Sequence, residues 1–193
     1  MIAYVGPDLP HDLLAATGRD AGPLGWSIDR AMPVADQWVE SKFPLWARSI
    51  VQDWADGVLD GLDAVLFSRA DDSAQRLYYY LCELRRQGLV KGPEPLILDV
   101  SKIARASSEA HLATVVRALA ERLGVDADAL EQGIVATNAR RREQAQVSSD
   151  RPVCLIGGNA PPDTRLHAII EGAGWAGAGD TLSDSWSRLG PLV

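Results

Sequence analysis

The order of short apolar runs and amphipathic helices is the feature that most constrains this chain. Residues 64–68 (AVLFS) and 95–100 (PLILDV) are almost continuously apolar. Each run precedes a stretch in which leucine, valine and other apolar residues recur at helical spacing, at 74–87 and 107–124. Wholly apolar strands, without alternation, are typical of parallel strands that helices cover on both faces. The sequence therefore predicts an α/β protein with a doubly wound, mostly parallel sheet.

The first part of the chain is predicted to hold most of this sheet. Residues 2–5 are a predicted strand followed by a short helix at 9–16, and residues 26–28 are a candidate second strand. A helix over 45–59 would place its apolar side chains on one face. A last helix of this part is predicted to start near residue 126.

A second, smaller α/β lobe is predicted after a basic, polar linker at residues 140–149. It starts with a strand at 153–156, continues into a helix at 163–172, and holds one further weak strand at best. Such a lobe is abbreviated, because an open sheet normally has several strands. The predicted division is a domain over 1–148 and a truncated lobe over 149–193.

The composition excludes several classes of partner. The net charge is −7 and 47% of the residues are apolar, so neither nucleic acid nor an anionic membrane surface is an expected partner. No apolar run reaches the roughly 18 to 20 residues of a membrane span, and the start lacks the basic segment of a secretory signal. We therefore expect a cytoplasmic protein. Cys82 and Cys154 lie far apart within apolar stretches and are predicted to be reduced, buried thiols.

Several stretches of the sequence also resemble a known family. Residues 62–88 (LDAVLFSRADDSAQRLYYYLCELRRQG) and 95–102 (PLILDVSK) are similar to the cluster-bearing subunits of the 2-hydroxyacyl-CoA dehydratase and benzoyl-CoA reductase family. The opening VGPDLPHDLLAATG resembles the first unit of that family, and RPVCLIGGNAPPD resembles the start of its second domain. The resemblance implies an α/β subunit of a complex that acts on acyl-CoA.

The cluster ligands of that family are not found at the matching positions. Members of the family hold an iron–sulfur cluster on cysteine thiolates, one just after a strand and one before a long helix. Asp71 and Phe43 stand at those positions here. The resemblance therefore implies that this chain alone binds no metal cofactor, that a partner holds any iron–sulfur cluster, and that an acyl-CoA is the candidate ligand.

The loops that follow the predicted strands are the candidate sites, because ligands of open parallel sheets bind beyond the carboxyl ends of the strands. The polar loop after residues 64–68 can bind a ligand or a partner, or it can simply cap the next helix through Asp72 or Ser73. The glycine loop at 157–159 either leaves amides free for a phosphate or carboxylate, or is a tight turn. The candidate site residues are Ser68, Arg69, Asp71, Asp72, Ser73, Arg76, Gly157, Gly158 and Asn159.

Aromatic residues are the candidates for a contact with another subunit. Tryptophan and tyrosine are enriched in interface cores, and six tryptophans are many for 193 residues. The candidate interface residues are Trp46, Trp54, Tyr78 and Tyr79, with core packing as the alternative for the two tryptophans. His11, His111 and His167 are isolated in the sequence and are predicted to be surface or capping residues.

Two functions follow from these observations. The first is a cluster-free subunit or accessory protein that assembles with itself or with a larger homologue in a dehydratase- or reductase-like complex. The alternative is an enzyme subunit that supplies contacts to an acyl-CoA, through Arg69, Asp71, Asp72 or Ser73, while a partner holds the cluster. The apolar surfaces that a truncated lobe leaves uncovered favour assembly.

Overall fold

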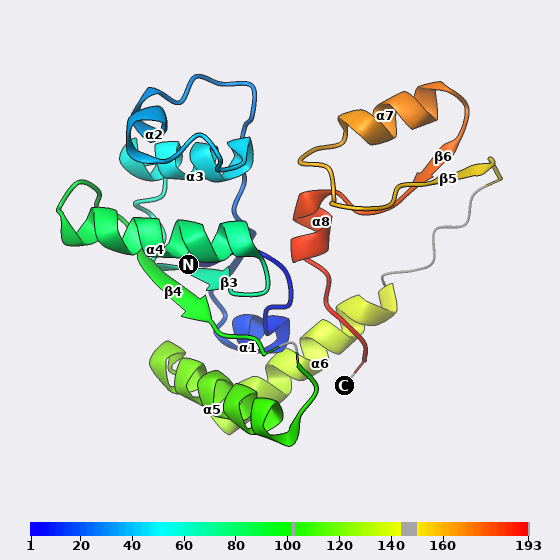
Figure 1. Cartoon of the computed structure of the whole chain (residues 1–193). Helices are drawn as coiled ribbons and strands as arrows, with labels where there is room; N and C mark the ends of the chain where they lie inside the picture. The colour runs from blue at the N-terminus through cyan, green and yellow to red at the C-terminus, as the bar shows by residue number, and fades with distance from the viewer. Residues whose placement is uncertain (102, 144–149, 193) are drawn as a thin grey trace.

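A four-stranded parallel sheet forms the centre of the chain in the computed structural model, which describes residues 1–101, 103–143 and 150–192. The strand order is β2-β1-β3-β4. Helices α3 and α4 lie on one side of this sheet, and α1, α5 and α6 lie on the other (Figure 1). The predicted α/β fold is thus confirmed. The strands are β1 (Ile2–Val5), β2 (Asp20–Pro23), β3 (Ala64–Ser68) and β4 (Glu94–Leu98).

Apart from α2 (Pro33–Trp38), which was not predicted, the helices of the first lobe form where the apolar spacing predicts them, with small shifts of their ends. Helix α4 (Asp72–Arg86) buries Ala74, Leu77, Leu81 and Leu84, which recur at helical spacing on the face that meets the sheet. The other helices of the first lobe are α1 (His11–Ala16), α2 (Pro33–Trp38), α3 (Leu45–Ala55), α5 (Ala106–Leu123) and α6 (Ala127–Glu143).

The second strand lies elsewhere than predicted. The sequence favoured residues 26–28, but β2 (Asp20–Pro23) pairs with β1. An edge strand is held by backbone hydrogen bonds to one neighbour, and its side chains need not be apolar. This polar, glycine-containing segment therefore lacks the apolar run that predicts a strand. The apolar side chain of Trp26 instead packs against Trp46 and Trp186. Its apolar character reflects side-chain packing and not strand pairing.

The small lobe consists of one strand-helix-strand unit. Strands β5 (Val153–Leu155) and β6 (Ala176–Ala178) pair in parallel and are joined by α7 (Arg165–Gly172). The predicted first strand and helix of this lobe are confirmed within about two residues. Helix α8 (Leu182–Trp186) was not predicted, because five residues are too few for a periodic pattern. A capping box between Thr181 and Asp184 starts it.

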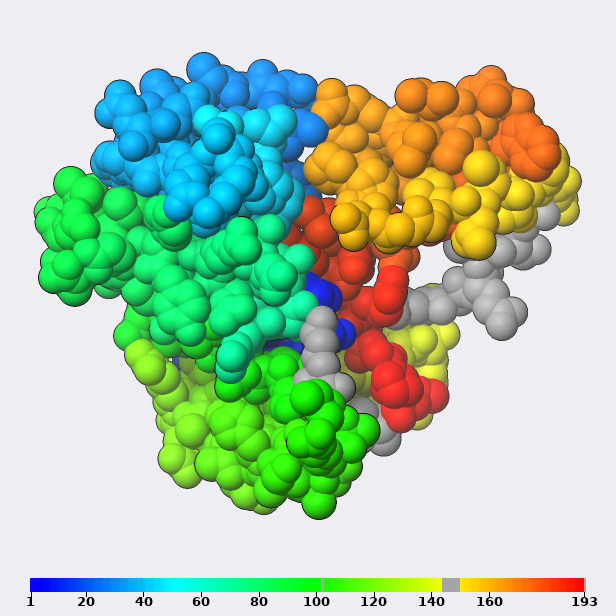
Figure 2. Space-filling view, in the orientation of Figure 1, coloured from blue at the N-terminus to red at the C-terminus, as the bar shows by residue number. Residues whose placement is uncertain are grey.

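The segment after β6 returns to the first lobe. The side chain of Trp186 is only 1% exposed and belongs to the main core. Its ring lies 4.8 Å from the ring of Trp26 and 5.1 Å from that of Trp46. Figure 2 shows this segment (red) between the small lobe (yellow and orange) and the first lobe. The boundary after residue 148 stays a prediction, and residues 144–149 of the predicted linker lie outside the described part of the chain.

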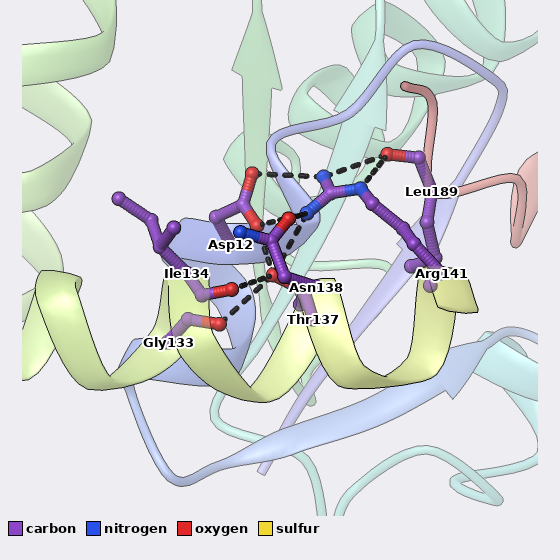
Figure 3. Close-up of polar contacts among 7 residues, drawn as sticks. All are labelled: Asp12, Gly133, Ile134, Thr137, Asn138, Arg141 and Leu189. Carbon is purple, nitrogen blue, oxygen red and sulfur yellow. Dashed lines mark hydrogen bonds and ion pairs between the residues drawn. The ribbon is translucent and has the colours of Figure 1, made fainter. Parts of the chain in front are cut away.

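Hydrogen bonds from Arg141, which is itself ion-paired within the first lobe, attach the C-terminal segment to that lobe (Figure 3). The guanidinium of Arg141 binds both carboxylate oxygens of Asp12, at 2.8 and 3.0 Å. It also donates to the carbonyl oxygen of Leu189, from Nε at 3.0 Å and from Nη2 at 2.7 Å. Thr137 donates a further hydrogen bond to Asp12. We call Asp12, Thr137, Arg141 and Leu189 the clasp, because together they join α1, α6 and the C-terminal segment.

Candidate functional site

A cleft of about 580 Å³ opens at the carboxyl edge of the four-stranded sheet. The strand order reverses between β1 and β3, so the loops that follow these two strands diverge and leave a crevice. Pro7 from the first loop, Asp71 from the second and Ser73 from the first turn of α4 line the cleft. Gly158 and Asn159, from the loop after β5, line it from the small lobe. Two candidate loops, about 85 residues apart in sequence, therefore meet at one site, at the place that the topology of an open parallel sheet favours.

Apolar side chains form much of the cleft wall. Helix α3 contributes Leu45 and Trp46, and α8 contributes Leu182 and Trp186. The indole rings of Trp46 and Trp186 meet edge to face. Ser185 adds a hydroxyl from α8. A concave, largely apolar surface with a few polar groups is typical of a small-molecule site.

Asp71 caps helix α4 in addition to lining the cleft. Its Oδ1 accepts a hydrogen bond of 2.7 Å from the backbone amide of Ala74. The prediction named Asp72 or Ser73 as the cap, and it was wrong by one or two residues. The capping residue needs an extended backbone, which Asp71 has, whereas α4 already begins at Asp72. The carboxylate also places negative charge at the helix start, which makes this end unfavourable for an anionic ligand.

The remaining candidate residues lie outside the cleft. Ser68 is fully buried, and its hydroxyl accepts a hydrogen bond from the amide of Ala70. Arg69 forms an ion pair of 2.7 Å with Asp99, which in turn contacts His111 at 3.2 Å. Asp72, Arg76 and Gly157 are exposed and are not among the residues that line it. The structure thus brings together Asp71, Ser73, Gly158 and Asn159, and it separates the other five from them.

The candidate interface residues divide between core and surface. Trp54 is 2% exposed and donates its indole hydrogen to the carbonyl oxygen of Lys91 at 2.7 Å. Trp46 is also buried, so both tryptophans belong to the core and the prediction that they form an interface is corrected. Tyr78 is half-buried, and its burial, followed by its interaction with Cys82, raises its pKa to about 12. Tyr79 is 56% exposed and can reach a partner.

The side chains at the expected cluster positions do not fit an iron–sulfur cluster. Phe43 is buried and packs against Tyr80 at 5.0 Å, and Asp71 is used as a helix cap. Cys82 lies on α4 and Cys154 on β5, in different lobes, and both are half-buried, which corrects the prediction that these thiols are buried. In the described part of the chain, no three histidine, cysteine, aspartate or glutamate side chains form a group that could hold a metal ion.

No protein-family model and no curated protein matches this chain. The likeness to the dehydratase and reductase family accordingly remains an expectation from the quoted motifs. Among residues 1–101, 103–143 and 150–192, no helix is both long enough and apolar enough to cross a membrane.

Sequence reasoning missed two features near the cleft. His11 was predicted to be a surface or capping residue, but it is 3% exposed, and its Nε2 lies 3.1 Å from the carbonyl oxygen of Trp186. Burial lowers the pKa of this imidazole, although the hydrogen bond to Trp186 acts in the opposite direction. The second feature is a polar cavity at the carboxyl edge of the small lobe, where Asp180 and Arg188 form an ion pair. A signal for it was available, because Gly179-Asp180 directly follows a weak apolar run.

Proposed function

We propose that this chain is a cluster-free subunit of a complex resembling the acyl-CoA dehydratases and reductases, and that it acts mainly by assembling with itself or with a larger homologue. The observation that supports the proposal is the incomplete cover of the small lobe. Its sheet has two parallel strands with one connecting helix, whereas parallel sheets are normally buried on both faces.

Several large apolar side chains of this lobe are exposed to solvent. Leu155 is 81% exposed and Val153 is 56% exposed, and alternation along the strand places both on one face of β5. On α7, Ile169 is 70% exposed and Leu166 is 42% exposed. Burying one such side chain contributes about 1.5–3 kcal/mol. Covering these side chains with another chain would therefore contribute a free energy comparable to that of a stable association between two protein chains.

Light scattering on the purified full chain tests this proposal. We expect a dimer, or a complex with a homologue recovered from the same cells, that Leu155→Lys and Ile169→Lys dissociate. Val58→Lys is the matched control, because Val58 is also an exposed apolar residue, at 65%, but it lies in the first lobe. A monomer at high concentration with no homologue recovered would refute the assembly, and so would equal effects of all three substitutions.

A second function, contact with the acyl arm of an acyl-CoA, is supported by the cleft. Its apolar walls suit an acyl chain, and Ser73, Asn159 and Ser185 can hydrogen-bond a thioester or amide. Among the residues that the structure describes, no arginine, lysine or histidine lines this cleft, so the phosphates of a coenzyme A would lie outside this lining.

An S-acyl-pantetheine, which carries no nucleotide, is the probe for this second function. Calorimetry is expected to show binding that Ser73→Ala and Asn159→Ala weaken, while the control Ser107→Ala, on the exposed start of α5, leaves it unchanged. Absence of binding at millimolar concentration, or equal affinity of all four proteins, would remove this function.

A further inference from the structure

A second cavity of about 400 Å³ lies at the carboxyl edge of the small lobe. Gly158 and Asn159 line it from the loop after β5, and Gly179 and Asp180 line it from the loop after β6. The cavity adjoins the cleft described above, because Gly158, Asn159 and Ser185 line both. It therefore lies at the end of two neighbouring parallel strands and is open toward an apolar wall.

The backbone brings the ends of these two strands into close contact. Leu155 pairs with Ala178, and the amide of Ile156 donates to the carbonyl oxygen of Ala178 at 2.7 Å. A Cβ atom at Gly179 would lie 2.8 Å from the Cβ of Ile156 and 2.9 Å from its carbonyl oxygen. Only glycine fits there, and its φ of 154° favours glycine as well. This close approach places the carboxylate of Asp180 on the same cavity as the loop after β5.

The arrangement matches a known way of binding ribose. In a parallel strand-helix-strand unit, a glycine turn after the first strand lets a ligand approach the backbone, and a carboxylate after the second strand accepts hydrogen bonds from ribose hydroxyls. Gly158 and Asp180 occupy these two places. We propose that this cavity binds the ribose of a nucleoside, with Asp180 as the acceptor for its vicinal hydroxyl groups.

The charges around the two cavities favour a nucleoside over a nucleotide. In the described part of the chain, the charged residues that line them are Asp71, Asp180 and Arg188, and Arg188 is already paired with Asp180. At the start of α7, Asp163 accepts a hydrogen bond from the amide of Arg165 and pairs with its guanidinium, so a carboxylate with its own counter-charge already lies at this helix end. A phosphate would meet more negative than positive charge. The apolar wall of the adjoining cleft provides a surface for an uncharged base.

Binding of adenosine and of 2′,3′-dideoxyadenosine to the full chain tests this inference. We expect the wild type to prefer adenosine on the order of tenfold or more, the contribution of charge-assisted hydrogen bonds to the hydroxyls. Asp180→Asn is expected to remove this preference. The control Asp163→Asn is expected to keep the preference for adenosine, because Asp163 lies at the far end of the loop between β5 and α7 and does not line the cavity.

Three results would overturn the inference: no binding of adenosine at millimolar concentration, equal affinity for the two nucleosides in the wild type, or tighter binding of adenosine 3′-phosphate than of adenosine. The last would assign the cavity to phosphate recognition by Arg188. The comparison of nucleosides on the wild type does not depend on how well a variant folds. The inference is also independent of the proposed function, since adenosine carries no acyl group and binds without a partner subunit.

Discussion

Removing one member of the clasp should cost more free energy than removing any exposed ion pair of this chain. The side chain of Arg141 is 6% exposed and that of Asp12 is 22% exposed. Breaking a buried ion pair by removing one partner typically costs about 3–5 kcal/mol, because the other charge is left without compensation. Since Asp12 keeps some contact with water, we expect Arg141→Met to lower the free energy of unfolding by about 3 kcal/mol, the lower end of that range.

A double-mutant cycle measured by urea unfolding separates this effect from simple loss of packing. Asp12→Asn leaves the guanidinium with a neutral partner, and Arg141→Met leaves the carboxylate without a cation. The double variant removes both charges, so it should be less destabilised than the sum of the two single variants. Arg86→Met is the control, because Arg86 pairs with Glu83 on the exposed face of α4 and should contribute little.

The measurements can refute this reasoning directly. A loss below about 1 kcal/mol for Arg141→Met, with additive effects in the double variant, would mean that the clasp behaves as a surface ion pair.

Two further perturbations have signs that follow from the structure. Burial lowers the pKa of His11 from its usual 6.5, so on acidification the unfolded chain binds this proton before the folded chain does. The free energy of unfolding should therefore fall as the pH drops below about 6.5. Urea midpoints measured at pH 7.5 and 5.5 should show this fall, and His11→Gln should reduce it. Gly133→Ala should destabilise by about 1–3 kcal/mol, since a Cβ atom there would lie 2.3 Å from the carbonyl oxygen of Asp12 and would force α1 away from α6. Thermal unfolding with Gly172→Ala, where a Cβ meets no neighbouring atom, is the control for the glycine substitution, and equal melting temperatures of the two variants would contradict the proposed close contact.

The sequence predicts those helices and strands whose own residues show which of their faces are buried. Strand β3 has five buried residues, and α4 has one apolar face, so each carries a local signal of burial. Strand β2 is defined by pairing with β1 alone, and its residues do not reveal it. Helix α8 is too short for periodicity, although the capping box around Thr181 marks its start.

The candidate site was predictable to the extent that topology determines it. Loops after parallel strands of one sheet meet at one edge, and Pro7 and Asp71, which follow β1 and β3, do so. The sequence could not predict which candidate site residues line the cleft and which lie on the surface, because this depends on which residue caps α4 and on how the small lobe is placed. The contribution of Trp186 was also invisible, since it joins Trp26 across most of the length of the chain.

The C-terminal segment connects the stability of the first lobe with the geometry of both cavities. Helix α8 contributes Trp186 to the cleft and Ser185 to both the cleft and the cavity of the small lobe. Arg188, two residues after Trp186, also lines the cavity of the small lobe. Arg141 holds the next residue, Leu189, by its carbonyl oxygen. Because the chain between Trp186 and Leu189 is short, displacement of Leu189 must also move the wall that α8 provides. The clasp lies outside both cavities, yet it positions residues that line them, so its loss should weaken ligand binding even where the chain stays folded.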